Sequence, residues 1–201
     1  MKQRLLNVIA WEGIRGRIMS TVMATGNADM ERAAIHLLDP NPTDAVLVIG
    51  CGPGVGARML AERLGQGRVV ATDPSSVMAR STSRRIRRAR LSQSVEVLRA
   101  SAHALPAVEG SMDGVVSVNN IQLWPDLDAG LAEVARVLRG GGRFVVELHE
   151  WAVPEPYEVT SWMTELSDRM ALVGLVARST RRRVRYRSGR GFEVLAERMQ
   201  Q

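Results

Sequence analysis

A continuous apolar run that breaks into regularly spaced glycines constrains the fold of this chain more than any other feature. The run is Ala45–Ile49, and the glycines after it occupy every second position: Gly50, Gly52, Gly54 and Gly56. Such a run predicts a buried strand, and the glycines predict a turn whose missing β-carbons let a ligand lie against the backbone. The helix expected over 57–64 would direct its first amide groups back at that turn. The segment therefore predicts a site for a nucleotide-like cofactor, with tight packing of the glycines as the alternative.

An acidic residue follows at the spacing that a nucleoside site requires. The apolar run at 69–71 predicts a second strand, and Asp73 lies just beyond it, 19 positions after Gly54. A carboxylate about 20 positions on, at the tip of the second strand, can accept hydrogen bonds from both ribose hydroxyls. A helix N-cap or a turn ahead of Pro74 is the alternative role, and the two roles are compatible. Because the glycines alternate strictly instead of following Gly-x-Gly-x-x-Gly, a cofactor without phosphates is favoured over a dinucleotide.

Three later segments stand in order behind the glycine turn. They are 102–106 (Ala-His-Ala-Leu-Pro), 110–116 (Gly-Ser-Met-Asp-Gly-Val-Val) and 131–146, which contains Gly-Gly-Gly at 140–142. With the glycine turn, they resemble the motifs of class I S-adenosylmethionine-dependent methyltransferases, particularly the small-molecule enzymes that include the ubiquinone and menaquinone C-methyltransferases. The resemblance covers about residues 40–150. Four motifs in register are far more specific than one.

Apolar runs separated by helical patterns predict the fold class. Strands are expected near 46, 69, 95, 115 and 144. Helical spacing over 131–138 predicts a helix that Gly140–Gly142 stop in a left-handed turn, with a strand at 144–148 starting at once. A helix over 160–173 and strands over 175–187 and 192–196 would add an antiparallel hairpin. The expected fold is a Rossmann-like, doubly wound α/β sheet of seven strands, mostly parallel, with an antiparallel C-terminal hairpin strand and an N-terminal helical cap.

Length and composition predict one domain in a reducing compartment. The 201 residues suit a single methyltransferase domain, with a helical cap at 1–40, a cofactor-binding core at 41–150 and a C-terminal helix and hairpin at 151–201. No run has the character of a signal peptide or membrane span, and the single cysteine, Cys51, cannot form an internal disulfide, so a cytoplasmic protein is expected. The three histidines are isolated in sequence, so no metal site is expected.

The resemblance implies that S-adenosylmethionine is the cofactor and assigns its contacts along the chain. The expected cofactor-binding residues are Gly50, Cys51, Gly52, Pro53, Gly54, Asp73, Pro74, Ser101, Ala102, His103 and Asn119. The glycine turn would line the methionine portion and the ribose, whose hydroxyls Asp73 would hold. Ala102 would meet the adenine edge through its backbone amide, and Asn119 would lie beneath the amino acid end.

Two positions depart from the family pattern. The family has an acidic residue two places before the first glycine, where this chain has Val48, and an Asp or Asn at the adenine amino group, where it has Ser101. The first change removes a favourable charge near the cofactor ammonium, and a charge-assisted hydrogen bond contributes about 1.5–3 kcal/mol. We expect either modest affinity or compensation by Glu12 or another residue of the N-terminal segment. A catalytically inactive relative that only binds the cofactor is an open alternative.

Residues after the fourth and fifth strands are the candidates for the acceptor site. Methyl transfer from a sulfonium is an in-line displacement, so the enzyme positions the two groups and can add a general base. His149 is the catalytic candidate because its reference pKa lies near neutrality, with a satisfied polar residue at a strand end as the alternative. Aromatic and methionine side chains predict walls for a small-molecule substrate that is apolar or ring-bearing, although core packing explains about half of them equally well. These side chains are Trp124, Trp151, Tyr157, Trp162, Met19, Met23 and Met30. Oxygen is favoured over nitrogen or carbon as the acceptor, because of His149 and the lack of a cysteine nucleophile.

Arginine clusters keep a second partner class open. They comprise Arg84, Arg85, Arg87, Arg88 and Arg90 in one group and Arg181, Arg182, Arg183, Arg185, Arg187 and Arg190 in another. A solvated edge strand protected by charge is one interpretation, and an acidic partner such as RNA, a phosphorylated substrate or an anionic membrane surface is the other. An RNA methyltransferase is disfavoured because no stacking aromatic residues interleave the arginines. A nicotinamide-dependent oxidoreductase is disfavoured by the glycine spacing and by a single lysine, and the oligomeric state, including a homodimer, stays open.

Overall fold

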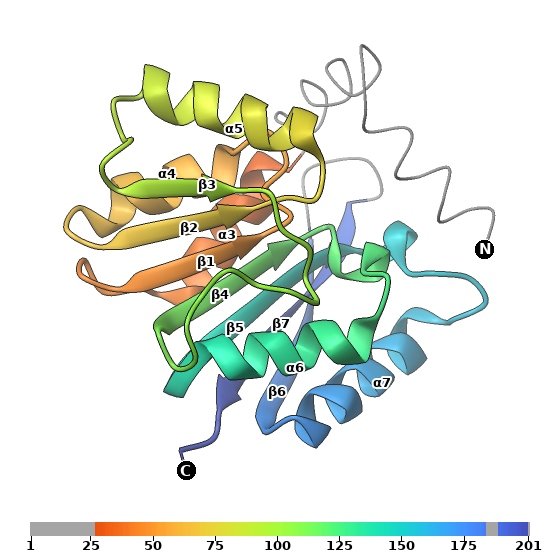
Figure 1. Ribbon diagram of the computed structural model, residues 1–201. Coiled ribbons are helices and arrows are strands. Elements are labelled where there is room, and N and C mark those ends of the chain that lie inside the picture. The colour runs from red at the N-terminus through yellow and green to blue at the C-terminus, as the bar shows by residue number, and fades with distance from the viewer. Residues whose placement is uncertain (1–26, 184–188, 201) are drawn as a thin grey trace.

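The computed structural model describes residues 27–183 and 189–200, which form a seven-stranded sheet in the order β3-β2-β1-β4-β5-β7-β6 (Figure 1). The strands are β1 (Ala45–Ile49), β2 (Arg68–Thr72), β3 (Val95–Leu98), β4 (Met112–Val118), β5 (Leu138–His149), β6 (Leu175–Arg183) and β7 (Arg190–Arg198). Strands β1 to β5 pair in parallel, whereas β7 runs antiparallel to both β5 and β6. The predicted seven-stranded fold class with an antiparallel hairpin is therefore confirmed.

Helices cover both faces of this sheet. They are α3 (Ala28–Leu38), α4 (Val55–Leu64), α5 (Ser76–Arg88), α6 (Leu127–Val137) and α7 (Val159–Leu172), with short 3-10 helices η1 (Ile121–Leu123) and η2 (Glu150–Ala152). One apolar core joins α3, α4 and α5 to one face, and a second joins α6 and α7 to the other. Figure 1 shows α6 and α7 in front of the sheet and α3 and α4 behind it. All five residues of β1 are buried, as a parallel strand covered on both faces requires.

The glycines at 140–142 play a different part from the one predicted. Helix α6 ends at Val137, and the next residue, Leu138, is already extended and begins β5. Gly140–Gly142 therefore lie inside the strand, where Gly141 takes a φ of +73° and the pairing with β4 shifts register between Met112 and Gly114. The predicted left-handed helix stop is wrong, because the glycines permit an irregular strand start instead.

The N-terminal segment and the hairpin tip are described in part. Helix α3 packs against α4, β4 and β5, in the layer of helices that covers one face of the sheet. The residues Glu12, Met19, Met23, Arg185 and Arg187, for which the sequence predicts roles, lie outside the described residues. Among residues 27–183 and 189–200, no helix combines the length and apolar character that crossing a bilayer requires. Across those same ranges, no three His, Cys, Asp or Glu side chains gather as metal ligands would.

The strand order defines where a ligand binds. Strand β1 lies between β2 and β4. After β1 the chain adds β2 and β3 on one side of it, and then crosses over to add β4 on its other side. In open α/β sheets, ligands bind beyond the carboxyl ends of the strands at this reversal point. The carboxyl ends of β1, β2 and β4 are therefore the place to look for a site.

Candidate functional site

Only one glycine of the turn presents bare backbone to open space. A β-carbon added to Gly50 would lie 2.6 Å from the Asn120 side chain, and one added to Gly54 would lie 2.7 Å from Thr82. At Gly52, by contrast, no atom lies within 4 Å of that position, and φ is +52°. The first and third glycines are thus required by packing and by their positive φ, while Gly52 leaves room for a ligand against the main chain.

Asp73 lies directly beside this open backbone. Its carboxylate accepts hydrogen bonds from the backbone N–H of Gly52 and of Ser75, each at 2.9 Å. Burial raises the pKa of Asp73, and these two hydrogen bonds oppose the rise. The N-cap of α5 is Ser75, whose hydroxyl accepts from the Met78 N–H, so Asp73 forms the turn before the helix and not its cap. A carboxylate with two amide partners keeps lone pairs for further donors such as ribose hydroxyls.

Helix α5 fixes the glycine turn from one side. The Thr82 hydroxyl donates to the Gly52 carbonyl at 2.7 Å, and the Arg85 Nε donates to the Pro53 carbonyl at 2.8 Å. Thr82 also contacts the Cys51 sulfur at 3.5 Å. Burial raises the pKa of the Cys51 thiol to about 12, so this cysteine is an inert part of the turn. Sequence reasoning missed Thr82, because an isolated threonine in a helical pattern carries no signal of a long-range contact.

The segment after β3 forms the next wall of the site. Ala102 is buried, Pro74 and His103 are exposed, and the Ser101 hydroxyl lies 3.0 Å from the His103 Nδ1. Helix α6 holds the following residues. Glu133 accepts from the Leu105 N–H at 2.8 Å, and Arg136 donates to the Leu105 carbonyl at 3.1 Å. The structure thus places the predicted adenine-side residues on a loop held at its base by an ion pair of α6.

Two asparagines tie the carboxyl ends of β4, β1 and β5 together. Asn119 has a φ of +53°, and its side-chain carbonyl accepts from the His149 N–H at 3.0 Å. Asn120 donates to the Ile49 carbonyl at 2.9 Å and accepts from the Trp124 indole N–H at 2.9 Å. Asn120 was not among the predicted site residues, although the Asn-Asn pair at a strand end was visible in the sequence. Its role depends on a partner 71 positions away.

His149 ends β5 and is almost completely enclosed. Its side chain is 1% exposed, and its ring stacks against Trp151 with the ring centroids 5.4 Å apart. Trp151 itself is 54% exposed. The predicted base therefore lies at the end of β5, enclosed by protein and stacked against a half-exposed aromatic ring.

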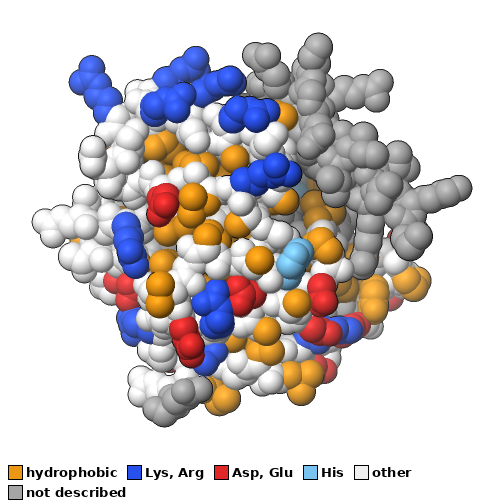
Figure 2. Space-filling view, viewed as in Figure 1, with side chains coloured by type: hydrophobic (Ala, Val, Ile, Leu, Met, Phe, Trp, Pro, Cys, Tyr) orange, Lys and Arg blue, Asp and Glu red, His pale blue; other side chains and the backbone are white. Residues whose placement is uncertain are grey.

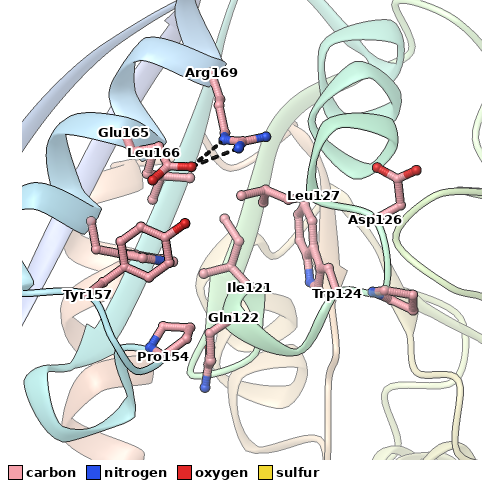
Figure 3. Close-up of a pocket in the computed structure, with 12 residues that line it drawn as sticks. Ile121, Gln122, Trp124, Asp126, Leu127, Pro154, Tyr157, Glu165, Leu166 and Arg169 are labelled. Carbon is pink, nitrogen blue, oxygen red and sulfur yellow. Dashed lines mark hydrogen bonds and ion pairs between the residues drawn. The ribbon is translucent and has the colours of Figure 1, made fainter. Parts of the chain in front are cut away.

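A cavity of about 330 Å³ lies next to these strand ends, between η1, α6 and α7. It is lined by Ile121, Gln122, Trp124, Pro125, Asp126, Leu127, Pro154, Tyr157, Trp162, Glu165, Leu166 and Arg169. Figure 3 shows Trp124 and Tyr157 on opposite sides of Ile121, with Arg169 bonded to Glu165. Three of the four aromatic residues predicted to gather here do so, whereas Trp151 lies outside the lining. Gln122 links the cavity to Asn119, because its side-chain amide donates to the backbone carbonyl of Asn119 at 3.3 Å.

The arginines of α5 divide into two kinds. Arg85 is partly buried and serves the glycine turn, as described above. The exposed arginines of this helix are Arg80, Arg84, Arg87 and Arg88. Figure 2 shows these basic side chains gathered along the edge of the molecule over α5. In the other cluster, Arg181 donates to the Thr160 hydroxyl at 2.8 Å and lies 3.5 Å from Glu150, so it joins β6 to neighbouring segments.

Comparison with known proteins agrees with this geometry. Residues 46–142 match a protein family described as a methyltransferase domain. An uncharacterized 37.1 kDa protein in transposon TN4556 of Streptomyces fradiae is 30% identical over 168 residues, which cover 80% of this chain and 48% of that protein. The fatty-acid O-methyltransferase of Mycolicibacterium smegmatis is 36% identical over 123 residues, which cover 61% of this chain and 42% of that enzyme. The chain thus spans less than half the length of each of these two relatives.

A solved structure shares the fold. The crystal structure of an S-adenosylmethionine-dependent methyltransferase from Aquifex aeolicus superposes with a TM-score of 0.69 at 17% identity, over 87% of this chain and 91% of that chain. The open backbone at Gly52 and the Asp73 carboxylate lie beyond the carboxyl ends of β1 and β2, where open α/β sheets bind ligands. Residues 46–142 thus match a methyltransferase domain, and the chain has the fold of an S-adenosylmethionine-dependent methyltransferase.

Proposed function

We propose that this protein transfers a methyl group from S-adenosylmethionine to an oxygen atom of a small-molecule acceptor. The observation that carries the proposal is the open backbone at Gly52 beside the buried carboxylate of Asp73. A bare main chain next to a carboxylate suits the ribose of a nucleoside, and nothing in the turn is built to neutralise phosphates. The residues present therefore fit this cofactor.

The proposal assigns each wall of the site a role in binding the cofactor. Asp73 would accept from the ribose hydroxyls, the Ala102 backbone would meet the adenine, and Asn119 would lie under the amino acid end. When bound, the cofactor supplies a methyl group on a positively charged sulfur. The protein contributes position, because Asn119 and Asn120 hold the ends of three strands together. His149 would accept the proton of an acceptor hydroxyl, after Trp151 moves aside from its ring.

The cavity beside η1 supports an apolar or ring-bearing acceptor. Its volume of about 330 Å³ lies within the range of small-molecule sites, and Trp124, Tyr157 and Trp162 provide flat apolar walls. Arg169 contributes little net charge, since it is paired with both Asp128 and Glu165. One relative is named a fatty-acid O-methyltransferase, which is consistent with an oxygen acceptor on an apolar body.

Calorimetric titration tests the cofactor assignment. We expect S-adenosylmethionine and S-adenosylhomocysteine to bind, and NAD to produce no heat of binding. Binding of NAD alone would contradict the proposal, and binding of the two nucleosides without any turnover would indicate a protein that only binds the cofactor.

Transfer of a labelled methyl group tests the acceptor. A panel of fatty acids, phenols, amines and activated carbon acids would be incubated with the labelled cofactor, and the product bond identified by mass spectrometry. We expect label on oxygen, and we expect His149→Gln to lower kcat while the affinity for S-adenosylhomocysteine stays unchanged. Label found only on nitrogen or carbon would overturn the oxygen preference, and unchanged kcat would remove His149 as the base.

A further inference from the structure

Two features of the glycine motif are not explained by the contacts described so far. The fourth glycine, Gly56, lies inside helix α4 and is buried, away from the open backbone at Gly52. Val48 occupies the place where the family has an acidic residue, and it is 3% exposed within β1. Both features are accounted for by one residue of the N-terminal helix.

That residue is Glu31, in the first turn of α3. A β-carbon at Gly56 would collide with the Glu31 carboxylate, so the glycine is what allows the carboxylate to approach α4. The preceding residue, Met30, contacts the Asn119 side chain through its sulfur at 3.2 Å. The first turn of α3 therefore reaches from the end of β4 to the start of α4, on either side of the carboxyl end of β1.

The surroundings of Glu31 disfavour its negative charge unless a positively charged group lies beside it. Its side chain is partly buried, and among the described residues no hydrogen bond or ion pair reaches the carboxylate. Burial raises the pKa of Glu31 to about 8. Its negative charge in turn raises the pKa of Cys51 in the glycine turn, so the two groups share one electrostatic environment. An acidic group in this position is costly unless a positive ligand arrives.

We propose that Glu31 pairs with the α-ammonium group of the cofactor's amino acid end and takes over the role of the acid that Val48 replaces. The proposal rests on the proposed use of S-adenosylmethionine. It explains Gly56 as a position cleared for a carboxylate from α3, and it makes α3 part of the cofactor site as well as of the core.

The test compares variants and ligands by calorimetry. Glu31→Gln keeps the shape of the side chain and removes its charge, while Glu62→Gln on the exposed surface of α4 serves as the matched control. Three ligands separate the parts of the cofactor. S-adenosylhomocysteine has both the ammonium and the carboxylate, its decarboxylated form S-adenosyl-3-thiopropylamine keeps only the ammonium, and 5′-methylthioadenosine has neither.

We expect Glu31→Gln to lower the affinity for the first two ligands by about ten-fold or more, because their ammonium group loses the carboxylate that it pairs with. The affinity for 5′-methylthioadenosine, which has no ammonium group, should stay unchanged. Glu62→Gln should leave all three affinities as in the wild type. Because Gln resembles the protonated Glu and needs no proton to fold, the variant should melt at or above the wild-type temperature, which establishes that it is folded.

Equal weakening of all three ligands would overturn the proposal, since Glu31 would then act only on the shape of the site. Unchanged binding of S-adenosylhomocysteine to Glu31→Gln would overturn it as well, and the proposed function would still stand. If the wild type binds none of the three ligands, the proposed function and the role of Glu31 both fail.

Discussion

At the scale of single residues, Asp73 combines an observed structural role with a proposed role in binding. The sequence offered two roles for it, a ribose contact and a turn residue. In the structure its carboxylate already binds the N–H groups of Gly52 and Ser75, so it shapes the turn before any ligand arrives. Removing the whole side chain would leave two amides without acceptors as well as removing the ligand contact.

The prediction for Asp73 therefore uses two substitutions. Asp73→Asn keeps one acceptor oxygen but loses the charge. We expect it to weaken the binding free energy of S-adenosylhomocysteine by about 1.5–3 kcal/mol, measured by calorimetry. Asp73→Ala should in addition lower the free energy of unfolding in urea by about 1–3 kcal/mol, because the amides lose their partner. Wild-type affinity in both variants would show that the ribose does not bind here.

At the scale of elements, α3 and α4 approach so closely that a side chain on one requires a glycine on the other. The contact joins the first turn of α3 to the first turn of α4 through Glu31 and Gly56. Close packing of this kind makes the two positions energetically dependent on each other. Further along, Thr82 and Arg85 of α5 bind the carbonyl groups of the turn, so three helices determine the shape of one loop.

A double-mutant cycle tests this coupling. We expect Gly56→Ala to lower the free energy of unfolding by about 1–3 kcal/mol, because the new methyl group collides with the Glu31 carboxylate. Combined with Glu31→Ala, the same substitution should cost clearly less, because the space is then free. Urea unfolding of the four proteins measures the coupling, and strictly additive effects would mean that the two side chains do not compete for this space.

At the scale of the whole molecule, burial opposes the ionisation of the acidic groups at the candidate cofactor site. Burial raises the pKa of Asp73, and it raises that of Glu31 from 4.5 to about 8. Between these two values, the folded chain holds a proton at Glu31 that the unfolded chain has released. The free energy of unfolding therefore decreases as the pH rises through this window.

The pH dependence of stability should reveal the Glu31 proton. From about pH 5 to pH 8, the wild type should lose stability relative to Glu31→Gln by at most about 1.4 kcal/mol per pH unit. Urea unfolding at several pH values measures the difference, and all other titrating groups cancel because both proteins share them. A constant difference across this range would show that Glu31 ionises in the folded state as it does in the unfolded one.

The sequence by itself determined the fold class and was sufficient to predict a candidate cofactor site. Apolar runs and helical spacing depend on neighbours in the chain, so they were sufficient to predict the seven-stranded sheet, the hairpin and the turn at Gly50–Gly54. The placement of Asp73 beside Gly52 followed from the spacing of two consecutive strands.

Only the tertiary structure decided which glycine of the turn leaves its backbone open, that Gly140–Gly142 belong to β5, and that Asn120 and Thr82 hold the turn. It also brought the Glu31 carboxylate of α3 against Gly56 of α4. Each of these contacts joins residues that are far apart along the chain. Local periodicity carries no information about such pairs, because they are chosen by how helices and strands pack.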